Sequence, residues 1–250
     1  MVAGIETPIT RGRGPIWLLH PTAILILASF FAYGVINYDS IPDPIPTHWG
    51  AGGHPNAWSP KSFGTVFFPL MMGAGASALL SLITAAVPMM VPPDKDATRW
   101  ALYRREGMIR GTVAAMGSTA VLIAVIFGFL TVTGWNNPKH VPVWPVLLLT
   151  AVILGAVLTS YAMASRWARR TALHEGIRPT AAEQKEEKLW TVGGLFYKNP
   201  EDPHVLVPKR TGTGTGLTVN VGNPKGRAAV AIFLCVFVVV PLVLGTIMAL

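Results

Sequence analysis

The chain contains few charged residues and only one cysteine. Charged side chains make up 13% of its 250 residues, against 51% for hydrophobic ones. Its single cysteine, Cys235, excludes an intrachain disulfide and a multi-cysteine metal site. The sequence shows no Ser-His-acid order, paired carboxylates or nucleophile elbow that would support a hydrolase. We therefore predict no catalytic site and no cofactor, and we do not interpret the chain as an enzyme.

Asp, Glu, Lys and Arg are missing altogether from five apolar stretches, each about the length of a bilayer span. The stretches are 16–36, 66–87, 112–132, 143–164 and 228–249. A helix of about 20 apolar residues crosses a hydrocarbon core of about 30 Å, and it satisfies its own backbone hydrogen bonds in lipid. Five buried helices of a soluble domain would need polar faces that these stretches lack. We predict an all-α membrane protein with five transmembrane helices.

Basic residues are concentrated in alternate connections between the spans. Eighteen of the 20 Lys and Arg residues lie in the N-terminal tail, the loop after the second span and the segment 165–227, whereas only Lys61 and Lys139 lie in the other loops. Cytoplasmic loops of membrane proteins retain Lys and Arg. We therefore expect a multi-pass protein of the cell inner (plasma) membrane, with a cytoplasmic N-terminus and an external C-terminus. The net charge of +8 then reflects topology and attraction to anionic lipid, and we expect no nucleic-acid partner.

The spans divide the chain into three regions. Residues 1–164 are expected to form a four-helix transmembrane region with an external loop at 37–65. Residues 165–227 form a cytoplasmic segment between the fourth and fifth spans, and residues 228–250 hold the fifth helix. The first apolar run is longer than the core of a signal peptide, so we expect it to be a membrane span.

The cytoplasmic segment contains short β-prone runs separated by turns. These runs, at 189–192, 195–197, 204–207 and 217–221, predict a small antiparallel β module at 189–224. Leu217, Val219 and Val221 alternate with polar residues, which suits a sheet with one apolar face against the membrane surface. The Thr-Gly repeat at 211–216 could cradle an anion, but its spacing is not that of a nucleotide loop and a strand follows it. We interpret it as a flexible hairpin connection.

Proline and glycine determine the expected shape of the external loop. Three prolines between residues 42 and 46 forbid a continuous helix and favour extended backbone. Three glycines between residues 50 and 53 then permit a sharp reversal. Trp49 and Trp58 suit the headgroup level of a membrane, where amphipathic rings are favoured. We predict that the loop is ordered and packs on the ends of the spans.

Histidine and aspartate in the external loops leave a zinc site as an alternative interpretation. Its candidate ligands are Asp39, Asp43, His48, His54 and His140. The two loop histidines lie six residues apart, which matches no standard ligand spacing. We therefore predict no metal site, and we expect His48 to hydrogen-bond loop carbonyls.

Two segments carry a resemblance to known families. The string Ile45-Pro46-Thr47-His48-Trp49, followed by Gly53, Asn56, Trp58 and Lys61, resembles the signature of domain of unknown function 1648, the N-terminal part of SdpI-like membrane proteins. His54 stands where that family more often has an acidic residue. The segment 189–224 is similar to another small uncharacterised domain found with such membrane proteins. The resemblances cover roughly residues 16–90 and 189–224.

The first resemblance implies a function. The SdpI-like family includes immunity proteins that protect a Gram-positive cell from a membrane-active toxin, and a member can relay the presence of toxin by drawing a repressor to the membrane. This chain has no obvious copy of the longer C-terminal part of those proteins. We expect an integral membrane immunity or sensor protein that meets membrane lipid and a toxin peptide. The expected ligand-binding residues are His48, Trp49, Gly53, Asn56, Trp58 and Lys61.

Two other functional classes stay open. The chain could be an accessory subunit of a larger membrane complex or transporter, because the small residues Gly73, Gly75, Ala76 and Ser77 allow close helix approach, although they could equally pack within the chain. A membrane enzyme acting on lipid or peptide is the third interpretation. His20, beside Pro21 at one end of the first span, is expected to lie at the membrane interface.

Overall fold

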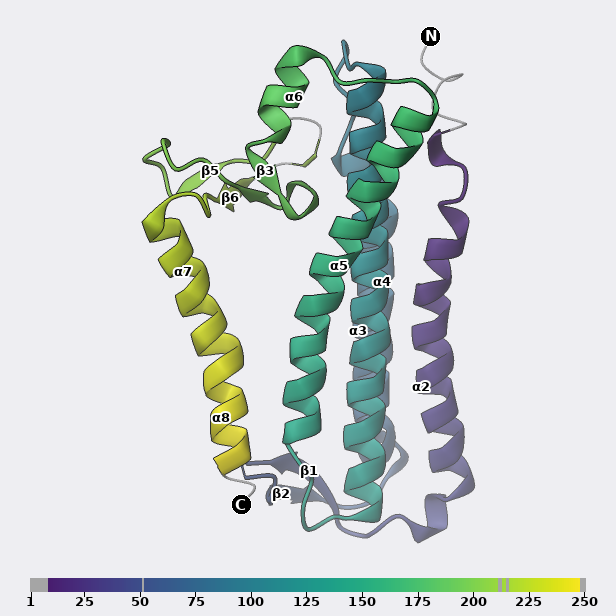
Figure 1. The fold of residues 1–250 in the computed structure, drawn as a ribbon. Coiled ribbons are helices and arrows are strands. Elements are labelled where there is room, and N and C mark those ends of the chain that lie inside the picture. Colours follow the sequence, from purple (N-terminus) through teal and green to yellow (C-terminus); the bar gives the residue numbers. More distant parts are fainter. Residues whose placement is uncertain (1–8, 51, 211–212, 215, 248–250) are drawn as a thin grey trace. The chain divides into compact units, whose positions relative to one another are not determined.

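The structure is a computed structural model that describes residues 9–50, 52–210, 213–214 and 216–247 (Figure 1). Four of its described helices are long and apolar enough to cross a membrane, which makes this a mostly helical, multi-pass membrane protein. They are α2 (Leu19–Ile36, preceded by a 3-10 turn at Gly14–Leu18), α3 (Phe63–Met90), α4 (Arg99–Asn136) and α5 (Trp144–His174). The first four predicted spans are therefore confirmed as long apolar helices.

Helices α4 and α5 are longer than the apolar stretches they contain. At about 1.5 Å per residue, the 38 residues of α4 reach roughly 57 Å, beyond a hydrocarbon core of about 30 Å. Its first turns, from Arg99, are charged and carry the buried Glu106. Helix α5 continues past Ala164 to His174, so the basic run at 166–170 extends the fourth span.

The fifth predicted span, 228–249, is not one regular α-helix. Helix α7 (Pro224–Leu234) passes into a π-helical stretch (Cys235–Val239) and then into α8 (Val240–Ile247). A π turn interrupts the regular i to i+4 ladder, and such turns are rare. The described part of this stretch is helical throughout, but it is not among the four long helices.

Contacts group the chain into two compact units, each described here by itself. Unit 1 comprises Met1–Trp17, Leu82–Met116 and Gly155–Leu234, and unit 2 comprises Leu18–Ser81, Gly117–Leu154 and Cys235–Leu250. The core of unit 2 joins α2, α3 and α4 through Leu27, Phe67 and Trp135, among others. Gly34 on α2 faces the rings of Phe67 and Trp135 so closely that a Cβ there would lie 2.7 Å from Phe67. Glycine therefore lets these helices approach each other.

The loop between α2 and α3 forms a β-hairpin within unit 2. Strands β1 (Ile45–Trp49) and β2 (Pro55–Ser59) pair antiparallel, with Ile45 opposite Ser59 and Trp49 opposite Pro55. Ile41 and Ile45 are buried in the same core cluster as the helices. The loop is thus packed on the helix ends. The prolines and glycines indicated extended backbone and a reversal, and the structure adds strand pairing.

A small β module follows α5 in unit 1. Helix α6 (Ala181–Glu187) leads into β3 (Trp190–Thr191), a 3-10 turn (Val192–Gly194) and β4 (Phe196–Tyr197), and then into β5 (Leu206–Pro208) and β6 (Leu217–Val219). The pairs β3–β4 and β5–β6 are antiparallel, and a bridge between Tyr197 and Asn220 joins them. Figure 1 labels β3, β5 and β6 in this module. The predicted antiparallel sheets are confirmed.

The interior of this module is polar. Thr218 is buried and its Oγ1 donates a hydrogen bond to Leu195 O at 2.5 Å, whereas Leu217 is 59% exposed. The apolar alternation of Leu217, Val219 and Val221 therefore does not mark the face that packs inside the module. Residues 211–212 and 215 of the Thr-Gly repeat lie outside the described residues. Lys209 N donates to Gly216 O at 2.9 Å, which fits a hairpin connection there.

Candidate functional site

The hairpin of unit 2 contains all six predicted ligand-binding residues, and Lys61 holds its base. Lys61 Nζ donates to Ile41 O at 2.9 Å and to Asp39 O at 3.3 Å, and it lies 4.9 Å from the centroid of the Tyr38 ring. The backbone N–H of Lys61 donates to Asp43 Oδ1 at 3.0 Å. Lys61 therefore joins the start of α3 to the segment that leads into β1.

His48 and Asn56 form a polar pair across the two strands. His48 Nδ1 lies 2.5 Å from Asn56 Oδ1, so the imidazole donates to the amide oxygen. This partner is a side chain, and not the backbone carbonyl that the sequence indicated. The strand register shifts on both sides of His48. Such irregularities redirect side chains in a sheet, and here both members of the pair are exposed.

The two hairpin tryptophans differ in their surroundings. Trp49 is half-buried and packs on α4 at Gly134, where a Cβ would lie 2.8 Å from the Trp49 ring. Its buried Nε1 has no hydrogen-bond partner among the residues that the structure describes. Trp58 is 46% exposed and stands opposite Pro46 in the ladder. Trp49 thus attaches the hairpin to α4, and Trp58 presents an apolar surface.

Gly53 connects the turn of the hairpin to the segment that follows α4. It has a positive φ of 75°, and its carbonyl accepts a hydrogen bond from Val141 N at 2.9 Å. A Cβ at Gly53 would collide with Val141 O. The ring of the neighbouring His54 lies edge-on to His140, with centroids 5.2 Å apart. Glycine is required here both by the backbone conformation and by the close approach.

The structure does not gather the zinc ligands considered from the sequence. Asp43 accepts from Lys61, His48 pairs with Asn56, and His54 meets only His140 among those candidates. No group of three or more His, Cys, Asp or Glu side chains that could hold a metal ion occurs within the described ranges. The hairpin instead exposes the Trp58 indole and the His48–Asn56 pair. Contacts of Lys61 and Gly53 hold its base.

Two other sequence expectations concern residues in the helices of unit 2. His20 is buried, and its Nδ1 lies 2.9 Å from Ser81 Oγ, so its side chain packs between α2 and α3. A Cβ at Gly73 would lie 3.1 Å from Leu27, and Ser77 is fully buried. A Cβ at Gly75 meets nothing within 4 Å. Part of the small-residue face of α3 thus packs within the chain, and Gly75 faces open space.

The sequence did not reveal the residues outside the two strands that support the hairpin. Asp43, Tyr38 and Val141 support the hairpin through contacts with Lys61 and Gly53. The sequence carries no signal for the contact with Val141, because 88 residues separate it from Gly53 in the chain. The Asp43 contact had a local signal, since an acidic side chain among prolines can accept backbone N–H groups.

Comparison with known families supports the resemblance to domain of unknown function 1648 and finds a second family near the C-terminus. Residues 24–73 match the family model described as a domain of unknown function (DUF1648), and residues 200–227 match one described as a family of unknown function (DUF5808). The first match covers most of α2, the whole hairpin and the start of α3, and the second covers β5, β6 and the start of α7. No curated protein and no solved structure matches the chain.

Proposed function

We propose that this chain is an integral membrane immunity or sensor protein of the SdpI-like type. Its recognition surface is the hairpin, which meets an envelope-active toxin peptide or a lipid. The match of residues 24–73 to the domain of unknown function supports the assignment of the hairpin to a shared module. One observation carries the proposal: the base of the hairpin is fixed by Lys61 and Gly53, whereas His48, Asn56 and Trp58 are exposed.

The roles within the hairpin follow from these contacts. Trp58 contributes apolar area to a ligand, and Trp49 holds the strand against α4. The His48–Asn56 pair supplies polar groups for the ligand's backbone or headgroup. Gly53 and Lys61 keep the hairpin in its bound shape, which lowers the entropic cost of recognition. This function needs no cofactor and no catalytic residue.

The proposed orientation places the hairpin outside the cell. The basic residues then lie on the cytoplasmic side, together with the β module, as the distribution of Lys and Arg favours. Helices α7 and α8 with the π-helical stretch between them form a fifth span in this topology. From Pro224 to Ile247 a rise of about 1.5 Å per residue gives roughly 36 Å, which is sufficient to cross a core of about 30 Å.

Protection assays test the function directly. A bacterial strain that lacks the protein is challenged with a panel of membrane-active peptides and then complemented with variants. We expect the Trp49→Ala/Trp58→Ala double variant, and Trp58→Ala alone, to lose protection while membrane protein levels stay normal. Trp144→Ala is the matched control, because Trp144 is 52% exposed and lies outside the hairpin. Normal protection by a stably inserted double variant would remove the hairpin from the mechanism.

A second function is favoured by the open side of α3. At Gly75 a Cβ would meet no atom within 4 Å, so this position can admit a helix of another protein. The chain would then be an accessory subunit of a larger membrane complex or transporter. Purification from native membranes in mild detergent distinguishes the two functions, because an accessory subunit brings its partners in a fixed ratio. A membrane enzyme is the least favoured alternative.

A further inference from the structure

Unit 1 contains a cavity of about 380 Å³ that is separate from the hairpin. It is lined by residues of α4, of α5, of the turn after β3 and of the segment after β5. Its described lining includes four arginines, Arg104, Arg166, Arg169 and Arg210, and one carboxylate, Glu187. The lining of this cavity therefore carries an excess of positive charge.

Arg210 is the most buried cation of the cavity. Its side chain is 5% exposed, and its Nη2 donates to Glu186 Oε2 at 2.9 Å. Its Nε is also buried and has no hydrogen-bond partner in the described part of the chain. A buried N–H of a charged group is costly when no acceptor is present. An anion in the cavity that Arg210 lines would provide that acceptor.

The carboxylates near the cavity already have donors. Glu187 Oε1 accepts from Trp100 Nε1 at 2.5 Å, and Glu183 Oε1 accepts from Thr98 Oγ1 at 2.5 Å. Glu186 is shared, because Arg104 Nη1 lies 3.8 Å from the oxygen that Arg210 contacts. These glutamates attach α6 to the start of α4. The excess of positive charge remains on the cavity side.

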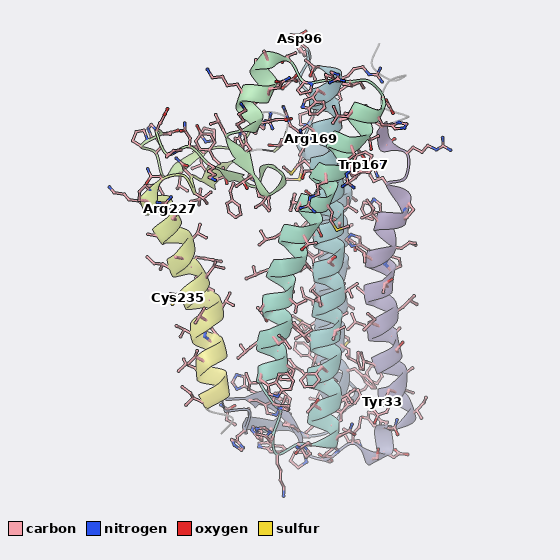
Figure 2. The ribbon with its side chains drawn as sticks, viewed as in Figure 1. Tyr33, Asp96, Trp167, Arg169, Arg227 and Cys235 are labelled. Carbon is pink, nitrogen blue, oxygen red and sulfur yellow. The ribbon has the colours of Figure 1, made fainter. Side chains whose placement is uncertain are left out.

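Two arginines lie at the exposed edge of the cavity. Arg166 and Arg169 both belong to α5 and are exposed, and Figure 2 labels Arg169 on this helix. Arg170, the next residue, is also exposed but does not line the cavity. The cavity thus has exposed cations at its edge and a buried one inside, an arrangement that attracts an anion and then desolvates it.

The backbone of the cavity wall adopts an unusual conformation. Val192, Gly193 and Gly194 all have positive φ, of 49°, 68° and 94°. A β-branched residue such as valine rarely enters this region, and strain of this kind concentrates at ligand sites. At Gly193 a Cβ would lie 2.5 Å from Tyr161 O, so the turn is pressed against α5.

We propose that this cavity binds a phosphate-bearing anion, with Arg210 as the buried anchor and Arg166 and Arg169 at the entrance. The planar fork of a guanidinium matches phosphate oxygens and strengthens such bonds by charge. The ligand is a phospholipid headgroup or a soluble phosphate ester, since both present the same group. Because the cavity lies in unit 1 and the hairpin in unit 2, this site is independent of the proposed recognition function.

The test uses the full-length chain, purified in detergent and stripped of lipid, with two probes. Inorganic pyrophosphate is titrated calorimetrically, and lipid retention is measured by native mass spectrometry after reconstitution with phosphatidylcholine or with phosphatidylglycerol. Arg210→Gln should weaken binding of the effective probe by at least about tenfold, and Arg169→Gln by about threefold. Arg170→Gln is the matched control on the same helix and should leave binding unchanged.

Each result has a defined meaning. Arginine-dependent binding of pyrophosphate favours a soluble phosphate compound as the ligand, and arginine-dependent retention of phosphatidylglycerol favours a lipid headgroup. If Arg210→Gln fails to fold, the comparison of Arg169→Gln with Arg170→Gln decides. Failure of the folded wild type to bind either probe overturns the site. So does binding that Arg210→Gln and Arg169→Gln leave intact, in which case the arginines only pair with α6.

Discussion

At the scale of single residues, Asn220 holds the β module together. It is fully buried, and its Oδ1 accepts from the backbone N–H groups of Asn199 and Gly222 at 3.0 and 2.9 Å. Its Nδ2 lies within 2.8 to 3.2 Å of the carbonyls of Asn199, Asp202 and His204. One amide thus satisfies buried backbone groups on both sides of the module.

Replacing Asn220 should loosen both sides of the module. Asn220→Ala leaves buried N–H and C=O groups without partners, so we expect the local free energy of opening to fall by about 3 kcal/mol. Asn220→Asp keeps the two acceptor contacts but directs negative charge at three carbonyls, and it should be at least as harmful. Hydrogen exchange of peptides covering 199–222 measures the change.

The control for this prediction is Asn136→Ala, an exposed asparagine at the end of α4. Exposed positions of this kind usually change stability by no more than about 0.5 kcal/mol. Unaltered exchange in Asn220→Ala would show that the module is held by other contacts. Asn220 lies in the segment 189–224 that resembles a known family, but the sequence does not indicate its role. All hydrogen-bond partners of its side chain are backbone groups, which only the folded structure brings together.

At the scale of elements, α6 is held by its acidic side chains. Glu183 closes a capping box with Thr180 at the helix start and also accepts from Thr98 on the segment before α4. Partial burial tends to raise the pKa of Glu183, but the hydrogen bonds from Thr98 and Thr180 and the charge of Arg104 outweigh it, so its pKa lies below the ordinary value of 4.5.

This lowered pKa predicts the pH dependence of α6 docking. A carboxyl whose pKa is depressed by folding stabilises the folded state above its unfolded pKa, and that contribution is lost as the pH falls through the folded pKa. We therefore expect proteolysis at 179–188 to accelerate on acidification below about pH 4.5. Glu183→Gln should cleave faster at neutral pH and show a weaker pH dependence. Equal pH profiles for both proteins would contradict the role of Glu183.

The elements differ in how far the sequence determined them. The four long helices follow from uncharged runs, since lipid admits little else. The charged residues at the start of α4 did not indicate a continuation of the same helix. Glu106 is buried there because it pairs with Arg13 and Arg110, and the sequence does not show these contacts. Strand pairing in the hairpin depends on contacts of Ile41 and Ile45 with the helices. The π-helical stretch at Cys235–Val239 has no pattern in the sequence that would reveal it.

At the scale of the whole molecule, the distribution of Lys and Arg favours one orientation in the membrane. Within unit 1 the N-terminal tail is tied to α4, because Arg110 Nη2 donates to Arg11 O at 2.7 Å and its guanidinium lies 3.6 Å from the centroid of the Trp167 ring. The tail, the charged start of α4 and the basic end of α5 therefore belong to one compact unit. We therefore expect these basic segments to lie on the same side of the membrane, as the proposed orientation requires.

Reporter fusions test this orientation and the fifth span together. We expect a cytoplasmic reporter to be active at Lys209 and an external one at Lys139 and at Leu250, which lies outside the described residues. The site at Lys139 is the control, since its position depends only on the four long helices. A cytoplasmic reporter active at both Lys209 and Leu250 would show that α7 and α8 do not cross the membrane. An external reporter active at Lys209 would reverse the whole topology, because eighteen basic residues would then have been translocated against the preference that orients membrane helices.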